Sequence, residues 1–432
     1  MNPYPSWGNL PSRPPRRVFP LADRHALLPR DEVSLIPQGN GRSYGDVCLN
    51  GDGGLVLTRA LDRFLFFDAA TGVLRCEAGV LLSDILALAV PQGWFLPVTP
   101  GTQFVTVGGA IANDVHGKNH HGAGTFGCHV GGLELLRSDG SRSWCSPEVN
   151  PEWFAATVGG LGLTGLITWA ELRLIPIHHP FLSVTSTRFG NLDEFFAINQ
   201  EAEAQHAYTV AWIDCLAKGP QLGRGIFMAG DHAGPVSRLP KYRSHPRNVP
   251  VQPPISLINN LSLRLFNAVY ARKPLGRPGG LMHYEPYFYP LDAVLHWNRL
   301  YGRKGFYQYQ CVLPPAVGRD GVAAMLRAIA KSGQGSFLAV LKTFGDVSSP
   351  GMLSFPQPGV TLALDFPNLG DKTRQLFQVL DSLVAQAGGR LYPAKDARMP
   401  ASLFRQGYPQ WERFQNFIDP QFSSDFRRRM ME

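Results

Sequence analysis

Residues 100–121 decide the fold, and they read Pro-Gly-Thr-Gln-Phe-Val-Thr-Val-Gly-Gly-Ala-Ile-Ala-Asn-Asp-Val-His-Gly-Lys-Asn-His-His. Few structural needs place so many glycines and alanines in one apolar segment. A flat ring system that lies along the backbone is one such need, because a chain without bulky side chains lets a ligand come close. The segment therefore predicts a backbone surface that holds a planar ligand.

A second glycine-rich loop lies upstream, at residues 37–46, and reads Pro-Gln-Gly-Asn-Gly-Arg-Ser-Tyr-Gly-Asp. Closely spaced glycines allow successive backbone N–H groups to point inward and bind an anion such as a pyrophosphate. The Gly-x-Gly-x-x-x-Gly spacing is one residue too long for a dinucleotide-binding fingerprint. Turn-forming residues 49–54 follow where that fingerprint requires a helix. Taken alone, the loop fits either phosphate binding or a plain tight turn.

A third patch of the same character, residues 157–165, reads Thr-Val-Gly-Gly-Leu-Gly-Leu-Thr-Gly. Main-chain groups that are free of side chains can follow an extended ligand from one segment to the next. Together, the three patches predict a long, folded cofactor that is held largely by the backbone.

The composition is typical of a globular protein with two domains, at 432 residues, 44% hydrophobic and 17% charged. The formal charge of +8 would suit binding to an anionic substrate or a membrane surface. The alternative is a soluble protein whose basic charge has no functional role. No run of basic residues with interleaved aromatics indicates nucleic-acid binding. The six cysteines form no Cys-x-x-Cys pair, which is typical of reduced thiols. We expect a cytoplasmic protein, in solution or peripheral at the inner face of the cell membrane.

Short β-type runs alternate with amphipathic segments, and this pattern predicts an α+β fold. In the first part of the chain, strands are expected at Val33–Ile36, Gly54–Thr58, Phe64–Asp68, Val73–Glu77, Gly131–Leu136 and Leu166–Leu174, and helices at Leu81–Val90 and Trp153–Val158. In the second part, strands are expected at Thr209–Asp214, Gly305–Leu313, Phe337–Phe344 and Val360–Phe366, and helices at Leu192–Gln205, Gly321–Ser332 and Lys372–Ala387.

A proline-rich change of texture at residues 176–180 indicates a domain boundary. The first domain is then 1–180, with an irregular arm at 1–30, and the second is 181–388. The C-terminal segment 389–432 is expected to return to the first domain. Residues 233–280 carry many prolines and basic residues around an apolar stretch, and they are either a mobile surface excursion or an ordinary helix with prolines on both flanks.

Several motifs carry a resemblance to a known family. The loop Gly-x-Gly-Arg-Ser-Tyr-Gly-Asp, the segments Thr-Val-Gly-Gly-Ala-Ile-Ala and His-Gly-Lys-Asn-His-His, and the patch Thr-Val-Gly-Gly-x-Gly-Leu-Thr-Gly resemble the FAD domain of the vanillyl-alcohol-oxidase family. Residues 297–299, 308–310, 353–356 and 365–367 resemble its decaprenylphosphoryl-ribose 2-oxidase branch. The resemblance covers the chain from about residue 35 onward. It implies a two-domain FAD-binding oxidoreductase with a mixed-sheet substrate (cap) domain.

The resemblance implies that FAD is bound noncovalently. Many relatives attach the flavin to a histidine in the first glycine loop, where this chain has Arg42, and arginine cannot form that bond. His116 is the nearby residue that could form a tether instead. The cofactor-binding positions carried over to this sequence are Gly39, Asn40, Gly41, Arg42, Ser43, Tyr44, Gly45, Pro100, Gly101, Thr102, Val105, Gly108, Gly109, Ala112, Asn113, His116, Gly117, Gly159, Gly160, Gly162, Thr164, Gly165, Ile167 and Tyr392.

Alcohol oxidation needs a hydride acceptor and a group that takes the hydroxyl proton. Lys395 is the first candidate, because desolvation beside a cofactor can lower the pKa of a lysine enough to make it a base. A surface lysine is the alternative. The further catalytic candidates are His116 and Tyr44, which would hydrogen-bond substrate or flavin. No spacing typical of zinc ligands is present, so we expect no metal.

Five residues are expected to line the substrate pocket: Gln308, Gln310, Lys342, Tyr301 and Lys118. Lys342 would suit a phosphate group. The alternative is that these residues point outward from their strands. Where the family pattern has a cysteine two residues before Asp-Phe-Pro, this chain has Ala363, so we expect insensitivity to thiol-directed inhibitors.

The resemblance implies oxidation of the 2-hydroxyl of a polyprenyl-phosphoryl pentose, such as ribose, to a 2-keto sugar. This reaction would be the first half of a 2′-epimerisation in cell-envelope polysaccharide synthesis. The implied partners are a lipid-linked sugar phosphate substrate, an NAD(P)H-dependent ketoreductase, and a quinone or O2 as electron acceptor. Separately, the basic and apolar composition of residues 233–280 suits contact with a membrane surface. Two alternatives stay open: an oxidase of a soluble alditol or aldonolactone, and a non-catalytic flavin-binding subunit.

Overall fold

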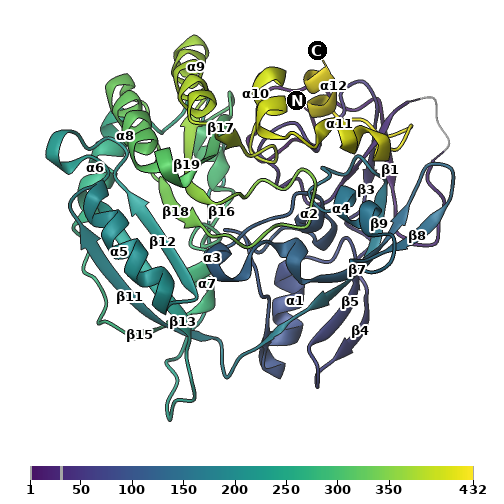
Figure 1. Ribbon diagram of the computed structural model, residues 1–432, viewed down its shortest axis with the longest axis horizontal. Helices are drawn as coiled ribbons and strands as arrows, with labels where there is room; N and C mark the ends of the chain where they lie inside the picture. The colour runs from purple at the N-terminus through teal and green to yellow at the C-terminus, as the bar shows by residue number, and fades with distance from the viewer. Residues whose placement is uncertain (1, 30–32, 432) are drawn as a thin grey trace.

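The computed structural model describes residues 2–29 and 33–431, and two large sheets organise it. Figure 1 shows the eight-stranded sheet and its helices in one half of the molecule and the N-terminal elements in the other. Helices and strands are mixed along the whole chain. The predicted α+β class is therefore confirmed.

The first half contains a five-stranded sheet in the order β4-β5-β9-β7-β8. Its strands are β4 (Phe64–Asp68), β5 (Val73–Glu77), β7 (Val130–Leu136), β8 (Arg142–Cys145) and β9 (Leu166–Arg173). Leu74 and Cys76 of β5 are fully buried, whereas the intervening Arg75 is exposed, as alternating strand positions require. The surrounding elements are α1 (Leu82–Ala89), α2 (Val107–Ala112), α3 (His120–Ala123), α4 (Pro151–Thr157) and the pair β6 (Trp94–Phe95) and β10 (Ile175–Pro176).

A small parallel sheet precedes it, in the order β1-β3-β2. Its strands are β1 (Arg17–Pro20), β2 (Leu35–Gln38) and β3 (Gly54–Leu57). The prediction of an irregular arm over residues 1–30 was wrong for β1, since Arg17 to Pro20 pair with Gly54 to Leu57. Within the predicted arm, residues 1 and 30 lie outside the described residues. The four-residue strand forms on the edge of β3, and so short a pairing leaves little signal in the sequence.

The second half is built on a sheet in the order β15-β11-β13-β12-β18-β19-β17-β20. Its strands are β11 (Phe181–Phe189), β12 (Tyr208–Ile213), β13 (Gly225–His232), β15 (Gly280–His283), β17 (Phe306–Leu313), β18 (Val340–Phe344), β19 (Gly359–Pro367) and β20 (Arg390–Leu391). We refer to it below as the cap sheet. Helices α5 (Leu192–Gln205), α8 (Pro315–Ser332) and α9 (Asp371–Gln386) cover its outer face in Figure 1.

The two faces of the cap sheet have different residues. On β17 and β19, Tyr309 and Leu364 pair and belong to the core under the helices. The adjacent pairs Gln308–Asp365 and Gln310–Ala363 lie on the opposite face, because strand side chains alternate. The polar face is therefore free to line a site.

The C-terminal segment packs on the first half of the chain. It contains α10 (Ala401–Gly407), α11 (Trp411–Phe414) and α12 (Asp425–Met431). Leu35 donates its N–H to the carbonyl of Gln421 at 2.7 Å, and Ser423 donates to the carbonyl of Leu35 at 2.9 Å. These bonds hold the segment against β2.

Residues 233–280 include one regular helix, α6 (Asn260–Ala271). This element matches the expected alternative of a helix flanked by prolines. Residues 233–259 are mostly irregular, and only β14 (Arg247–Asn248) interrupts them, pairing with β16 (Val294–Leu295). The short α7 (Tyr284–Phe288) follows β15. In the described part of the chain, no helix combines the length and apolarity needed to cross a bilayer.

Candidate active site

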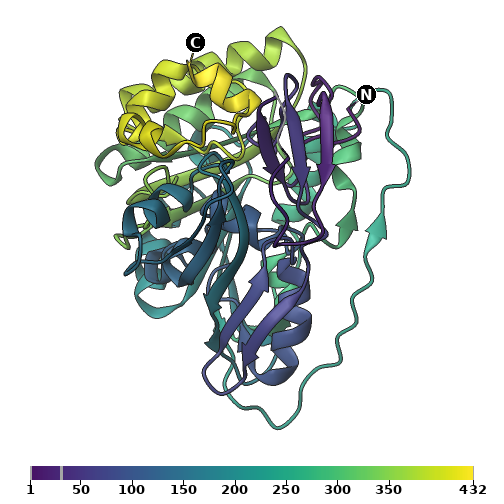
Figure 2. The same ribbon diagram turned by 90° about the vertical axis from the view of Figure 1, so that its right-hand side faces the viewer.

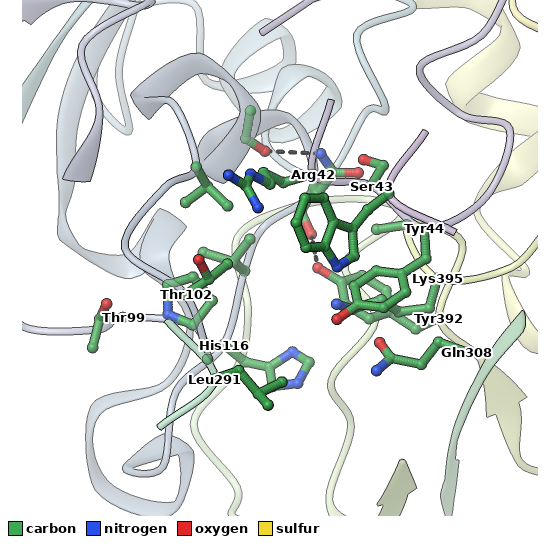
Figure 3. A pocket seen from close by; sticks show the side chains of 18 of the residues that line it. Arg42, Ser43, Tyr44, Thr99, Thr102, His116, Leu291, Gln308, Tyr392 and Lys395 are labelled. Carbon is green, nitrogen blue, oxygen red and sulfur yellow. Dashed lines mark hydrogen bonds between the residues drawn. The ribbon is translucent and has the colours of Figure 1, made fainter. Parts of the chain in front are cut away.

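A cavity of about 620 Å³ lies where the glycine-rich segments meet the cap sheet (Figure 3). Its volume falls within the usual range for small-molecule and cofactor sites. Most of the predicted residues line it: Gly39, Asn40, Gly41, Arg42, Ser43, Tyr44, Pro100, Gly101, Thr102, Val105, Gly108, Gly109, Ala112, Asn113, His116, Gly117, Lys118, Gly162, Gly165, Ile167, Gln308, Gln310, Lys342, Tyr392 and Lys395. The structure thus brings together segments that are separated by more than three hundred residues in the chain.

Hydrogen bonds to other segments fix the conformation of the first glycine loop, residues 37–46. Asn40 donates its side-chain amide to the carbonyl of Phe104 at 2.7 Å, and Tyr44 donates its N–H to the carbonyl of Ala394 at 2.9 Å. Gly41 has a φ of 59°, in the left-handed region that a side chain disfavours. These contacts fix the loop while its backbone borders the cavity.

The second glycine segment forms helix α2, which the sequence analysis did not predict. Thr106 caps the helix by accepting the N–H of Gly109 at 3.1 Å. A methyl group added at Gly101 would meet no atom within 4 Å, so this glycine leaves open space in the cavity wall. The side-chain oxygen of Asn113 is buried and has no partner. Both features are expected where a ligand fills the space.

Five predicted residues lie outside the cavity lining, and packing explains each of them. A Cβ at Gly45 would overlap the carbonyl oxygen of Asp396, and one at Gly160 would overlap that of Ala156. Gly159 adopts a φ of 71° against Ser354. Thr164 hydrogen-bonds the hydroxyl of Thr157 at 3.0 Å, and Tyr301 stacks on Phe306 at 4.2 Å between ring centroids. The placement of these five residues points to a structural role.

His116 lies at the centre of an aromatic cluster beside the cap sheet. The side-chain amide of Gln310 donates to its Nε2 at 3.0 Å, so the neutral ring carries its proton on Nδ1. Nδ1 is buried and has no partner. Burial, reinforced by the charges of Lys342 and Lys395, holds the pKa of His116 well below its usual range. The site thus contains a neutral histidine with an unused hydrogen-bond donor.

Lys395 is buried beside Tyr44, with its Nζ 3.9 Å from the ring centroid. Burial lowers the pKa of Lys395 to about 8, while the charge of Asp365 opposes that shift. Burial raises the pKa of Asp365 to about 7, against a hydrogen bond of 2.8 Å from Gln308 and the charge of Lys395. Figure 3 shows Tyr44, Lys395, Tyr392 and Gln308 on one side of the cavity. These groups can exchange a proton near neutral pH.

Two more lysines are buried at the cavity. Lys118 donates to the carbonyl of Tyr287, and Lys342 donates to the carbonyl of Gly117. Burial lowers the pKa of each amine to about 7, and the charge of Lys118 lowers that of Lys342 further. An anion beside them would restore their charge, so the pair suits an acidic ligand group.

The first loop also presents a positive charge. The guanidinium of Arg42 lies 4.0 Å from the ring centroid of Trp7, and its Nε is buried without a partner. Burial lowers the pKa of Arg42, whereas the charge of Asp292 raises it. A cation with an unused donor beside glycine backbone suits a phosphate group.

The lining residues that were not predicted from the sequence include Asp365, Asp292 and Trp7. Asp365 begins the Asp-Phe-Pro motif at residues 365–367. It pairs with Gln308 across two strands, so both side chains lie on the same face of the sheet. Because Gln308 was expected in the pocket, strand alternation could have predicted Asp365 there too. Trp7 gives no sequence signal, because it reaches the site through the bond from its N–H to the carbonyl of Ser43 at 2.8 Å. Asp292 accepts the N–H of Gln103 at 2.9 Å.

The cavity fits FAD. Its wall is glycine backbone over three segments, and it leaves buried polar atoms of Arg42, Asn113, His116 and Gln308 without partners. Long dinucleotides need such open main chain together with scattered polar contacts. The α+β fold and a cavity that fits FAD indicate the class of flavin-dependent oxidoreductases.

Comparisons with known proteins agree with this class. A family described as FAD binding domain matches residues 20–146. The chain is 37% identical over 412 residues to Decaprenylphosphoryl-beta-D-ribose oxidase of Mycolicibacterium smegmatis, covering 92% of this chain and 89% of that one. It is 30% identical over 185 residues to L-gulonolactone oxidase of Mus musculus, covering 41% of each. The chain belongs to the family of FAD-linked oxidoreductases that includes the mycobacterial enzyme, and FAD is its cofactor.

Proposed function

We propose that this protein oxidises the 2-hydroxyl of a polyprenyl-phosphoryl pentose, with ribose as the pentose, to a 2-keto sugar. The observation that carries the proposal is the cluster of Lys395, Asp365 and Gln308 at the cavity, where buried groups can take up a proton near neutral pH. The mycobacterial relative, whose name gives decaprenylphosphoryl ribose, supports the sugar and its lipid carrier.

Bound FAD supplies the hydride acceptor for the C–H bond that breaks. Lys395 binds the reacting hydroxyl and takes its proton at Nζ, while the carbonyl forms. Because its pKa is about 8, a usable fraction of the amine is neutral near pH 7. The ring of Tyr44 and the charge of Asp365 then stabilise the protonated lysine.

His116 and the buried lysines orient the substrate and the cofactor. Neutral His116 offers its Nδ1–H as a donor, which costs no desolvation of a charge. Lys118 and Lys342 hold the phosphate, whose charge restores theirs. Arg42 does not form a bond to the flavin, so we propose that FAD is held noncovalently.

The proposed 2-keto product requires a second enzyme if the sugar is to be epimerised. An NAD(P)H-dependent ketoreductase would return the carbonyl to an alcohol of the opposite configuration. Reoxidation of the cofactor requires a quinone or O2 as electron acceptor. Both partners belong to the proposal and follow from the chemistry of the product and the reduced cofactor.

A second candidate function is oxidation of a soluble aldonolactone or alditol. The similarity to L-gulonolactone oxidase favours it, although that match covers only 41% of the chain. The buried Lys118 and Lys342 argue against it, because an uncharged lactone leaves two buried amines without a counter-charge.

The test is anaerobic mixing of the holoprotein with a short-chain polyprenyl-phosphoryl ribose while the visible absorbance of the oxidised flavin is followed. A free alditol and an aldonolactone are mixed in parallel. Bleaching by the lipid-linked sugar alone supports the proposal. Bleaching by the soluble compounds alone selects the second candidate, and a flavin that none of them bleaches overturns both.

A further inference from the structure

The segment 233–280 concentrates the positive charge of the chain. It contains eight basic residues and no acidic one: Arg238, Lys241, Arg243, Arg247, Arg264, Arg272, Lys273 and Arg277. The chain has 41 basic and 33 acidic residues, so the remaining 33 basic residues balance all the acidic ones. The net charge of +8 is thus located in this one segment. Its irregular part runs along the right-hand edge of the molecule in Figure 2.

The same segment also exposes apolar side chains. On α6, Leu261, Leu265 and Val269 are 79%, 66% and 65% exposed. Their spacing of four residues places them on one side of the helix. Val251 and Ile255, just before α6, are exposed to a similar degree, and no other large apolar side chain among the described residues exceeds these five.

The opposite side of α6 fastens the helix to the protein. Leu263 is buried, and Asn267 donates its side-chain amide to the carboxylate of Asp214 at 2.7 Å. Asn259 caps the helix by accepting the N–H groups of Leu261 and Ser262. The contacts of Leu263, Asn267 and Asn259 therefore hold the helix in place. The side chains of its outer stripe (Leu261, Leu265 and Val269) take no part in them and stay exposed. Soluble surfaces rarely expose such a row of large apolar side chains unless it binds something.

We propose that the outer stripe of α6 (Leu261, Leu265 and Val269) and the basic segment around it dock on a membrane surface with anionic headgroups. An amphipathic helix with apolar residues on one side and basic residues around them lies in the plane of the bilayer interface. Anionic lipids attract basic residues near the membrane surface. The segment contains no acidic side chain that would be repelled by the headgroups. The charge selects a lipid surface over an uncharged apolar partner.

The cavity extends to the C-terminal end of α6, beside this docking surface. Tyr270 and Lys273, at the C-terminal end of α6, line the cavity, and the amine of Lys273 donates to the hydroxyl of Tyr270 at 2.8 Å. Tyr270 in turn packs on Trp212 of the cap sheet, with ring centroids 4.6 Å apart. This step rests on the proposed function: a lipid-linked sugar would pass from the bilayer to the cavity along the end of α6.

The test is cosedimentation of the holoprotein with vesicles of phosphatidylcholine, alone or mixed with phosphatidylglycerol, and with no sugar substrate. We expect binding to the mixed vesicles at least about tenfold tighter than to the neutral ones. The triple variant Leu261→Ser, Leu265→Ser and Val269→Ser should weaken that binding by at least about tenfold. The matched control, Val317→Ser, Leu369→Ser and Val379→Ser, changes exposed residues elsewhere and should bind as the unchanged protein does.

A protein that does not bind mixed vesicles, or whose binding survives the triple substitution, overturns the proposal. A dimer in sedimentation equilibrium that the triple substitution abolishes also overturns it, because a second copy then covers the stripe. Flavin bleaching by a water-soluble, short-chain substrate is measured separately and should be the same in the triple variant. Vesicle binding without bleaching leaves the docking inference standing while the proposed reaction fails.

Discussion

The two walls of the cavity present different chemical groups: main-chain atoms on one and polar side chains on the other. The wall from the first half of the chain is mostly glycine and other small residues, and it presents main-chain groups. The cap-sheet wall presents long polar side chains, such as Gln308, Lys342 and Asp365. Backbone suits a cofactor that stays the same over many reactions, whereas side chains can change with the substrate.

This difference has a physical consequence for substitutions. On the glycine wall, a side chain added at Gly101 would meet no protein atom within 4 Å and would occupy ligand space. On the cap-sheet wall, the loss of one charged group changes the reaction while the space stays the same. Substitutions on the two walls should therefore separate cofactor binding from turnover.

The largest effect is expected for Lys395→Ala. Removing the group that takes the proton should slow flavin reduction by the substrate about 10²- to 10⁴-fold, the usual contribution of a general base. Bound FAD should remain, because the glycine wall is unchanged. Stopped-flow absorbance measures the rate, and the exposed Lys372→Ala on α9 is the control. A rate within threefold of the control, a margin of about 0.6 kcal/mol, would remove Lys395 from the chemistry.

The second effect is expected for Gly101→Val on the glycine wall. No protein atom lies within 4 Å of an added methyl group there, so the apoprotein should keep its melting temperature. The side chain would occupy the cavity instead, and FAD affinity should fall about 10- to 100-fold, as an overfilled site costs about 1–3 kcal/mol. Fluorescence titration of apoprotein with FAD measures the affinity.

The control for Gly101→Val is Gly276→Val. An added methyl group at Gly276 also meets no atom within 4 Å, but this glycine lies outside the cavity lining. Its FAD affinity should match that of the unchanged protein. Equal affinities for both variants would show that the glycine wall near residue 101 does not border the cofactor.

A smaller effect is expected for Lys342→Gln. The amide keeps a hydrogen-bond donor for the carbonyl of Gly117 but loses the charge that would pair with a phosphate. We expect KM for a phosphorylated substrate to rise about tenfold, with little change in kcat, as for the loss of one charge-assisted bond. Lys331→Gln on the exposed side of α8 is the control. An equal KM increase with an unphosphorylated alcohol would contradict the phosphate assignment.

Much of the fold could be predicted because its elements carry local signals. The predicted strands at 64–68 and 73–77 and the predicted helix at 192–205 have the bounds found in the structure. Strands β11 and β13 escaped the analysis, since their polar and glycine residues gain their place only by pairing with each other. Helix α2 escaped because its glycines disfavour a helix, and the cap from Thr106 and burial of the segment overcome that preference.

The candidate site divides in the same way. Its glycine segments could be found from the sequence, because close backbone approach restricts residue type at each position. The positions of Gly45 and Gly160 could not be separated from the lining glycines, since packing against Asp396 and Ala156 makes the same demand for no side chain. Trp7 comes to the site through a long-range contact with Ser43 that no local pattern marks. Asp365, in contrast, shares a strand face with Gln308 and could have been found from strand alternation.

The smallest effect is expected in the pH dependence, and it tests the tuning of the base by the cap sheet. Lys395 is active when neutral, so flavin reduction at low substrate should rise with pH and level off above about pH 8, its pKa. The charge of Asp365 raises the pKa of Lys395. Asp365→Asn removes that charge, and the inflection should therefore move to lower pH.

The exposed Asp371→Asn at the start of α9 is the matched control and should leave the inflection in place. An inflection that moves to higher pH, or that stays fixed in Asp365→Asn, would mean that another group titrates in this range. The expected downward shift would show that a residue of the cap sheet sets the pKa of the base. In that case the side-chain wall controls proton transfer, while the glycine wall serves the cofactor alone.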